Sequence, residues 1–466
     1  MNSELPIIII GAGPAGLAAA RTIEKSGRKV IVLEKRSLVG GISSSRFWEE
    51  FIIEFGPHTY HVKEDEIDGL IRDHYDGVLA VKKRVTNMLI RGGYYDYPLK
   101  FWQLVRGLNP FFSAQMIGDF IYTSIKYTLF PRPDDSFETW GIKRFGRTLY
   151  NLCFGQYSRR VWGIAPARLS IRLASSKLHK LNLKDILVKL LGGKGQEQAT
   201  YWNDFLYPEE GMGVIFANMA KRIREGGGQI WLNTVPTGIT FRDNRVVSVI
   251  VDQDGEEHSV PCADVISTIP LTEVSKLCRP GLSEEEFTAG RSLRNRSLIL
   301  VNLIINSPII SRAHWIYLLD PHFRFNRFCE QKNLLLDPKP AKKTLITFEL
   351  CCEYDDLLWN ATDEELRALA LEDIASIDII DGSRAGKCLI TRVKDAYPIY
   401  DLAFEHNLET FLGGLSRIKN FYSTGRQGLF LNTDMHDTIH MGVQAARVVI
   451  SGRPPQSWYR EVSEFQ

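Results

Sequence analysis

The chain lacks an excess of charge of either sign. It carries 57 Lys and Arg residues against 55 Asp and Glu residues, a formal net charge of +2 over 466 residues. A balance this close gives no electrostatic reason to expect nucleic acid as a partner. The hydrophobic share of 44% and the charged share of 24% are ordinary for a globular protein. The length predicts two interleaved domains rather than one.

Cysteine is scarce and follows no pattern. The chain has seven cysteines, none in a CxxC spacing, and Cys351 and Cys352 are adjacent. Adjacent cysteines suit a buried strand better than a metal site, and we expect no metal. The odd count predicts a reducing compartment, which is the cytoplasm.

Long uninterrupted apolar runs are also missing. The most apolar stretch, Pro110 to Phe130, contains Asp119 and Lys126, which makes it too polar for a helix that spans a membrane. We favour helices of a second domain there, and contact with a membrane surface is the alternative. The first predicted strand starts almost at Met1, so we expect no signal peptide.

The most informative stretch of the sequence is its N-terminus. Four consecutive β-branched residues, Ile7 to Ile10, predict a strand that is buried on both faces. A GxGxxG motif follows from Gly11 to Gly16, and a helix is predicted to run on to about Ser26. The second strand, Val30 to Leu33, ends in Glu34, a carboxylate placed to bond a ribose hydroxyl. This order of elements predicts a dinucleotide site, with a structural glycine turn as the alternative.

Each glycine of the motif has its own expected role. Gly11 allows the tight turn, Gly13 lets a pyrophosphate approach the backbone, and Gly16 lets the helix pack against the strand. The helix start supplies free N–H groups and a positive dipole end for the pyrophosphate. The predicted cradle consists of Gly11, Gly13, Pro14, Ala15 and Gly16.

The residues after the second strand favour a flavin. Glu34, Lys35 and Arg36, followed by Gly40 and Gly41, resemble the flavin amine oxidase superfamily, which includes protoporphyrinogen oxidases, phytoene desaturases and UDP-galactopyranose mutases. The resemblance implies FAD as the cofactor and places the paired glycines close to it.

Two later segments resemble other parts of the same FAD site. In this superfamily the strand around Val235 lies on the adenine, and the strand from Asp264 reaches the cofactor near Thr268. The closing motif starts at Phe421, and its helix start is expected to face the flavin and to stabilise the reduced ring. Its expected cofactor residues are Gly425, Arg426, Asp434, Met435 and Ile439.

A glycine–proline turn carries two histidines. The segment with Gly56, Pro57, His58 and His61 resembles the GxHxxH turn of UDP-galactopyranose mutases. The resemblance implies that both histidines face the flavin ring. The alternative from the residues alone is two turn histidines, and a metal pair is not expected without a third ligand nearby.

The candidate substrate residues resemble the same mutases. Tyr157 and Trp162 form a YxxxxWG spacing that lines the substrate cleft in that family, and Arg296 matches an arginine that holds a diphosphate. A surface arginine before a strand is the alternative for Arg296.

The sequence also departs from the mutase pattern. Ser176 replaces the arginine of the mutase lid, and Phe430 and Asn432 replace two tyrosines that bond the diphosphate. We therefore do not expect galactofuranose formation in the usual way.

Together these patterns predict an α/β fold: a two-part Rossmann-like FAD domain with a mostly parallel sheet, and an interleaved α+β substrate domain. The expected FAD-binding parts are 1–90, 207–275 and 416–466, and the expected substrate-domain parts are 91–206 and 276–415. The predicted function is an FAD-dependent oxidoreductase that takes hydride from a small organic substrate at flavin N5. The alternatives are a mutase-like, non-redox enzyme acting on a nucleotide-linked sugar, and a flavin-bound protein without turnover.

Overall fold

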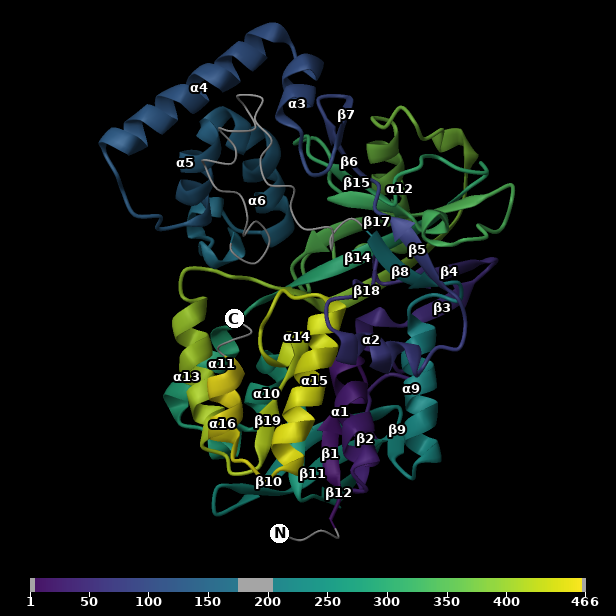
Figure 1. Ribbon diagram of the computed structural model, residues 1–466, viewed down its shortest axis with the longest axis vertical. Coiled ribbons are helices and arrows are strands. Elements are labelled where there is room, and N and C mark those ends of the chain that lie inside the picture. Colours follow the sequence, from purple (N-terminus) through teal and green to yellow (C-terminus); the bar gives the residue numbers. More distant parts are fainter. Residues whose placement is uncertain (1–4, 175–203, 463–466) are drawn as a thin grey trace.

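A parallel five-stranded sheet forms the lower half of the molecule in Figure 1. The computed structural model describes residues 5–174 and 204–462, so Ser176 lies outside the described residues. Every pairing in this sheet is parallel. Its order is β19 (Phe421–Ser423), β13 (Asp264–Ser267), β1 (Ile7–Ile10), β2 (Val30–Leu33) and β9 (Gln229–Trp231).

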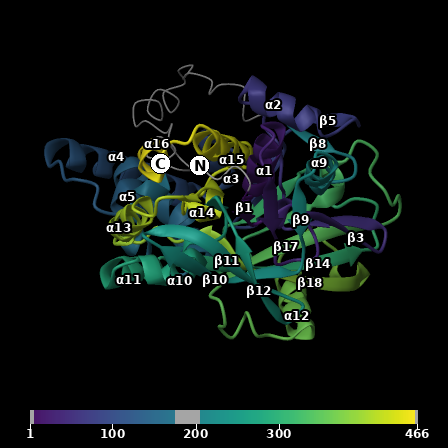
Figure 2. The ribbon, with the colours of Figure 1, turned by 90° about the horizontal axis from the view of Figure 1, so that it is seen from below.

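The two faces of the parallel sheet are covered differently (Figure 2). Helices α1 (Pro14–Lys25), α9 (Gly213–Glu225) and α15 (Met435–Ile450) cover one face, where Ile7 and Ile9 are buried. A three-stranded antiparallel sheet covers the other face, where Ile8 and Ile10 are buried. Its strands are β10 (Thr234–Arg242), β11 (Arg245–Gln253) and β12 (Glu256–Pro261). The prediction that the first strand is buried on both faces is confirmed.

A mixed seven-stranded sheet lies above the parallel one in Figure 1. Helix α12 (Asp363–Ile374) covers one face of this sheet, and Phe55 packs on the other face against Leu298 and Cys351. Cys351 and Cys352 lie in a fully buried strand, as predicted. The strand order is β18 (Ala385–Pro398), β14 (Asn295–Ile305), β17 (Thr344–Cys352), β16 (Arg327–Glu330), β15 (Trp315–Leu318), β6 (Thr86–Ile90) and β7 (Gly93–Asp96).

Helices and short hairpins complete the structure. The upper helices in Figure 1 are α3 (Phe101–Gly107), α4 (Pro110–Leu129), α5 (Phe137–Tyr150) and α6 (Gln156–Trp162). β3 (Ser45–Trp48) and β4 (Phe51–Glu54) form a hairpin, and β5 (Leu79–Lys83) pairs antiparallel with the distant β8 (Asp204–Pro208). The other helices are α2 (Asp65–Arg72), α10 (Leu271–Leu277), α11 (Glu284–Ser292), α13 (Phe404–Ser416), α14 (Gly425–Gly428) and α16 (Pro455–Glu461).

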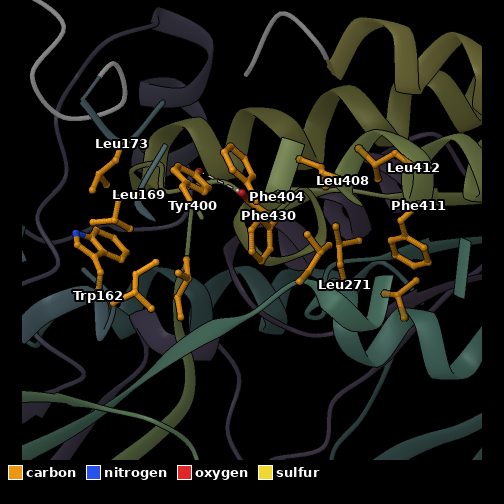
Figure 3. Packing of buried hydrophobic residues seen from close by; sticks show 14 of the residues in the cluster. Trp162, Leu169, Leu173, Leu271, Tyr400, Phe404, Leu408, Phe411, Leu412 and Phe430 are labelled. Atoms are coloured by element: carbon orange, nitrogen blue, oxygen red, sulfur yellow. Dashed lines mark hydrogen bonds between the residues drawn. The ribbon is translucent and has the colours of Figure 1, made fainter. Parts of the chain in front are cut away.

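One hydrophobic cluster joins the upper helices to the lower half (Figure 3). It runs from Trp162 at the end of α6, past Tyr400 and Phe404, to Leu412 in α13. Because a continuous core resists relative movement of the elements it joins, we expect the two halves to hold a fixed geometry.

The predicted fold class is confirmed, and the domain boundaries stay a prediction. Strands of the parallel sheet come from three separated stretches of the chain, as an interleaved architecture requires. The stretch from Pro110 forms one long helix, α4. Among the described residues, no helix is long and apolar enough to cross a membrane.

Candidate active site

The glycines of the N-terminal motif are needed for different reasons. A Cβ on Gly16 would stand 1.9 Å from the carbonyl oxygen of Gly11, so this glycine is required by close packing within the protein. Gly13 has φ −76°, which any residue adopts, and the nearest atom to a Cβ there would be the Cα of Gly41 at 4.0 Å. Neither a positive φ nor a close protein neighbour therefore explains why a glycine stands at position 13. The space beside it fits a group that is not part of the protein, such as a pyrophosphate.

The start of α1 is suited to an anion. Pro14 is its first residue, no side chain caps the N-terminal N–H groups, and no acidic residue lies in the first turn. The positive end of the helix dipole therefore points to the space beside Gly13 without a neutralising carboxylate.

Glu34 is buried where β2 ends. Its Oε2 accepts a hydrogen bond from the backbone N–H of Ala12 at 2.8 Å, and its Oε1 accepts one from the N–H of Arg36 at 2.9 Å. These two bonds fix the carboxylate between the glycine motif and the next loop. Each oxygen keeps a lone pair, which suits acceptance of two ribose hydroxyls.

The residues after Glu34 form a loop beside the motif. Lys35 is exposed, and Arg36 donates to the carbonyl oxygen of Gly41 at 3.3 Å and lies 5.1 Å from the ring of Phe55. Burial, followed by repulsion from Arg46, lowers the pKa of Arg36. Within the described residues Arg36 makes no ion pair, so its charge is free for an external anion.

The paired glycines return the loop to the motif. Gly40 donates from its N–H to the carbonyl oxygen of Ala12 at 2.8 Å. A Cβ on Gly41 would stand 3.1 Å from the Cα of Gly13, so the two backbones touch. Gly40 and Gly41 therefore form one wall of the space beside Gly13.

The closing motif packs directly on the first motif. Gly425 has φ +77°, and a Cβ there would stand 2.7 Å from the Cβ of Ala15. On α15, a Cβ on Gly442 would stand 2.2 Å from the carbonyl oxygen of Ala15. The structure thus brings together both predicted cofactor motifs, which lie about four hundred residues apart in the sequence.

Arg426 carries a buried positive charge that makes no ion pair among the described residues, and the carboxylate of Asp434 attracts it from a greater distance. Its Nη1 donates to the carbonyl oxygen of Thr433 at 2.7 Å and its Nη2 to that of Ala396 at 3.1 Å, while its buried Nε has no partner there. Burial lowers the pKa of Arg426. A guanidinium held in this way is suited to an anionic or electron-rich group of a ligand.

The remaining predicted cofactor residues lie around these motifs. Thr268 donates through Oγ1 to the carbonyl oxygen of Ile10 at 2.9 Å, at the carboxyl end of β1. Val235 is 43% exposed at the start of β10, and the preceding Thr234 donates to the carbonyl oxygen of Glu34. Asp434 caps α15, whose Met435 and Ile439 are buried.

His58 lies on the loop that follows β4. Its Nδ1 is 3.1 Å from the carbonyl oxygen of Gly56, and because a carbonyl only accepts, Nδ1 carries a proton. Burial, with repulsion from Arg426 and Arg327, lowers the pKa of His58 to about 4. The ring is therefore neutral at neutral pH, with Nε2 as an acceptor. Pro57, between Gly56 and His58, is half-buried.

His61 is directed to a different part of the structure. It is buried, its Nδ1 donates to the carbonyl oxygen of Asp204 at 2.9 Å, and its ring meets Phe205 edge-on at 6.4 Å. Burial lowers the pKa of His61 as well. These contacts join the loop to β8, and the predicted contact with the flavin stays a prediction.

Tyr157 and Trp162 lie in a cluster of aromatic rings. Tyr157 meets Tyr317 edge-on with centroids 6.0 Å apart, and Trp162 meets Tyr397 at 6.1 Å. The ring of Tyr397 in turn lies 5.4 Å from the guanidinium carbon of Arg426. The aromatic cluster therefore connects the predicted substrate residues to the closing motif. Burial raises the pKa of Tyr157 and of Tyr397, so both hydroxyls stay protonated donors.

Arg296 is buried, not on the surface, and its guanidinium is occupied by protein groups. Nη1 pairs with Glu353 at 2.7 Å, and Nε donates to the carbonyl oxygen of Val161 at 3.0 Å. These bonds anchor the end of α6 beside Trp162. The alternative of a surface arginine is wrong, and the predicted diphosphate contact would compete with Glu353.

Comparison with known protein families identifies the family to which the chain belongs. The model of the flavin containing amine oxidoreductase family matches residues 14–450, nearly the whole chain. The chain belongs to this family. The predicted recognition is confirmed, and FAD is the cofactor.

Individual relatives of this flavin family are distant. The chain is 22% identical over 194 residues to a probable UDP-galactopyranose mutase of Klebsiella pneumoniae, an alignment covering 40% of this chain and 48% of the relative. It is 40% identical over 68 residues to the putrescine oxidase of Kocuria rosea, covering 15% of this chain and 14% of the relative. These alignments span about half or less of each curated relative.

A solved structure extends the likeness in fold to the whole chain. The crystal structure of a reduced UDP-galactopyranose mutase superposes with a TM-score of 0.83 at 18% identity, covering 96% of this chain and 94% of that chain. Two positions depart from the tyrosines of the mutase pattern. Phe430 packs in the core (Figure 3), and Asn432 is buried. The hydroxyl of Tyr400 donates to the carbonyl oxygen of Phe430 and accepts from the N–H of Asn432.

Sequence reasoning missed a buried ion pair in this flavin protein. Arg327 on β16 pairs through Nε with Glu349 on β17 at 2.8 Å. A Cβ on Gly56 would stand 3.1 Å from Oε1 of Glu349, so the pair adjoins the loop of His58. The pairing depends on strand register, for which the sequence offered no signal.

A second missed group is Glu54, four residues before His58. Its buried Oε1 accepts from the N–H of Met212 at 2.7 Å and from Ser45 Oγ at 2.6 Å, and burial raises the pKa of Glu54 to about 7. An acid between isoleucine and phenylalanine, directly before the glycine–proline turn, was the available signal.

Proposed function

We propose that the protein is an FAD-dependent oxidoreductase acting on a small organic substrate. The observation that carries this proposal is the convergence of the two cofactor motifs on Ala15, with His58 and Arg426 brought together on the side of the aromatic cluster. When bound, the flavin accepts hydride at its N5 atom from the carbon that is oxidised.

The chain's own residues would bind the substrate and handle its proton. His58 is neutral, so its Nε2 is an acceptor for the proton released when an alcohol or amine carbon is oxidised. Tyr157 and Tyr397 keep their protons and can donate to a substrate oxygen. Buried aromatic rings, including Trp162, exclude water from this region.

The charges near the cluster favour a neutral or anionic substrate over a cationic amine. Among the described residues neither Arg426 nor Arg84 makes an ion pair, and the guanidinium of Arg84 lies 5.5 Å from the ring of Tyr97. The carboxylate of Glu349 is already neutralised by Arg327. A protonated amine would meet two arginines, while the carboxylate of Asp434 already caps α15 and attracts Arg426.

A mutase-like reaction on a nucleotide-linked sugar is the second candidate. Tyr157, Trp162 and His58 keep the mutase pattern in sequence, and the curated mutase relative supports the same reading. The pairing of Arg296 with Glu353 weighs against a diphosphate bound in the mutase manner.

One experiment separates the two candidates. The FAD-loaded protein is reduced with dithionite without oxygen and divided, and one part receives air while the other receives UDP-sugars. An oxidoreductase reoxidises with an electron acceptor and bleaches again with its substrate. A mutase-like enzyme binds the nucleotide sugar only when reduced and turns over without net redox change. No reoxidation by air or by quinone and nicotinamide acceptors would contradict the main proposal.

We also propose that the protein works in the cytoplasm. All seven cysteines are free, and six of them are buried, which supports a reducing compartment.

A further inference from the structure

The outward face of α4 is more apolar than its inward face. Phe111 is 87% exposed and Leu129 is 66% exposed. The inward positions are Ser113, Met116, Phe120 and Thr123, and the large outward positions are Phe111, Ile121, Tyr122, Ile125 and Leu129. A helix that faces water normally has the opposite arrangement, so the outward face is suited to an apolar environment.

The orientation of α4 is fixed by specific contacts. Asp119 accepts a hydrogen bond from the backbone N–H of Thr148 at 2.6 Å, where α5 is kinked. At the kink, Gly146 has φ +74°, and a Cβ there would stand 3.0 Å from backbone atoms of Phe120. This contact requires the small residue. The apolar side of α4 is therefore held outward, at the edge of the molecule in both views (Figures 1 and 2).

Neighbouring aromatic side chains enlarge the apolar face. Phe130, directly after α4, is 69% exposed, and Trp102 on α3 is also exposed. We call this face the α3–α4 surface. It consists of Trp102, Phe111, Ile121, Tyr122, Ile125, Leu129 and Phe130.

The charge around this surface is mainly positive. Between Tyr97 and Pro133 the only acidic residue is Asp119, which faces α5. Lys100 pairs with Asp96. The exposed cations that remain are Arg106, Lys126 and Arg132, and within the described residues none of them makes an ion pair. Directly after this stretch, Asp134 pairs with Lys143 and Arg144, and Asp135 is the one exposed acid beside the three cations. An apolar face bordered mainly by positive charge complements a surface that is apolar inside and negative outside.

We propose that the α3–α4 surface docks on an anionic lipid bilayer. Aromatic and aliphatic side chains enter the interface, while lysine and arginine contact acidic headgroups. The 20 residues of α4 would lie flat on the membrane and not cross it. A second copy of the chain is a poorer occupant, because a symmetric dimer would place the same unpaired cations opposite one another.

Docking would place the candidate site close to the membrane surface. Helix α4 is hydrogen-bonded to the kinked α5 through Asp119. Helix α5 leads through a short π-helical turn into α6, which carries Tyr157 and Trp162. The α3–α4 surface and the aromatic cluster therefore belong to one connected layer of helices.

The test is flotation of the FAD-loaded protein with lipid vesicles. One set of vesicles is phosphatidylcholine alone, and the other contains phosphatidylglycerol as well. We expect binding to the anionic vesicles that weakens with salt. The double variant I121E/I125E should bind at least about ten-fold more weakly. K126E should weaken binding to the anionic vesicles about five-fold.

The matched control is L357E, which changes a residue 93% exposed in a loop outside the surface. It should bind vesicles like the unchanged protein, and all variants should keep their FAD and thermal transition. The proposal is overturned if the unchanged protein stays with the lipid-free fraction at millimolar lipid, or if I121E/I125E floats equally well. A dimer that I121E/I125E dissociates would also overturn it, since a second copy would then cover the surface.

Discussion

A Cβ atom added to Gly442 would stand 2.2 Å from the carbonyl oxygen of Ala15. Helix α15, late in the chain, therefore touches the backbone of α1, the first helix. Gly425 approaches the same residue, since a Cβ there would stand 2.7 Å from Ala15 Cβ. The cofactor site is complete only when both ends of the chain are in place.

The first prediction uses two glycines of the same motif. Gly13→Ala should fold, because the nearest atom to the new Cβ is 4.0 Å away, but it should lose FAD affinity by about a hundred-fold as the methyl group meets the pyrophosphate. Gly16→Ala should fail to fold, because its Cβ would stand 1.9 Å from a carbonyl oxygen. Thermal unfolding measures the stability of each variant, and FAD absorbance measures how much cofactor it retains. Full FAD retention by Gly13→Ala would contradict the assignment of the space beside Gly13 to the pyrophosphate.

The second prediction concerns Glu34. Removing its carboxylate with Glu34→Ala should lower FAD affinity roughly ten-fold or more, since a charge-assisted bond to the ribose is worth about 1.5–3 kcal/mol. Glu34→Gln keeps an acceptor for the N–H of Ala12 and should lose less. FAD release during dialysis, followed by its fluorescence, makes the comparison. Equal retention by both variants and the unchanged protein would rule out the ribose role.

The cofactor side was predictable because its signals are local. Strand β1, the glycines and the acid at the end of β2 occupy one stretch of 28 residues, from Ile7 to Glu34, and the structure has β1 and β2 where they were expected. The closing motif was found by resemblance, but its contact with Ala15 is a tertiary contact that only the structure shows.

The substrate side was less predictable because its contacts depend on register and direction. Arg327 faces Glu349 only because β16 and β17 pair in one register. Arg296 was expected at a ligand or on the surface, and it is buried against Glu353. The stretch from Pro110 to Phe130 was expected to form helices of a second domain, but the sequence did not show which side of α4 faces outward. Ser176 lies outside the described residues, so the expected lid position stays a prediction.

The third prediction is a pH dependence of stability from Glu54. Burial raises its pKa from 4.5 to about 7, so between these values the folded state holds a proton that the unfolded state has lost. Stability should therefore fall as the pH rises from about 5 to 7, by roughly 2–3 kcal/mol at about 1.4 kcal/mol per pKa unit. Glu54→Gln should flatten this dependence and be the more stable form at pH 8.

Urea unfolding at a series of pH values measures the effect of Glu54. Glu364→Gln, a change at an exposed position of α12, is the control and should leave the pH dependence unchanged. The prediction fails if Glu54→Gln loses stability with rising pH as steeply as the unchanged protein.

The fourth prediction concerns the charge of His58. Its pKa of about 4 keeps the ring neutral through pH 6.5, where an ordinary histidine gains a proton. NMR titration of the histidine ring protons, with His58→Gln used to assign the signal, should show no titration of His58 near 6.5. Arg426→Gln should raise the pKa of His58, because repulsion from Arg426 is one cause of its depression. A His58 signal that titrates near 6.5 would contradict its proposed role as a neutral acceptor.

The last prediction compares two buried arginines. Arg426 makes no ion pair among the described residues, whereas Arg296 pairs with Glu353 at 2.7 Å. If the charge of Arg426 acts on the bound flavin, it favours the reduced, more negative form of the ring. Arg426→Gln should then lower the two-electron reduction potential by roughly 30–60 mV, which corresponds to about 1.5–3 kcal/mol of lost interaction.

Arg296→Gln is the matched control for this measurement. It removes a charge that is paired with Glu353, so the potential should change little. The free energy of unfolding should fall by about 1–2 kcal/mol, because the carbonyl oxygen of Val161 loses its donor while Glu353 keeps its pair with Arg294. Redox titration against a dye of known potential gives the reduction potentials of both variants, and urea unfolding gives the free energy of unfolding. If Arg296→Gln shifts the potential as far as Arg426→Gln does, the charge that acts on the flavin is not specific to the closing motif, and Arg296 then belongs to the ligand site after all.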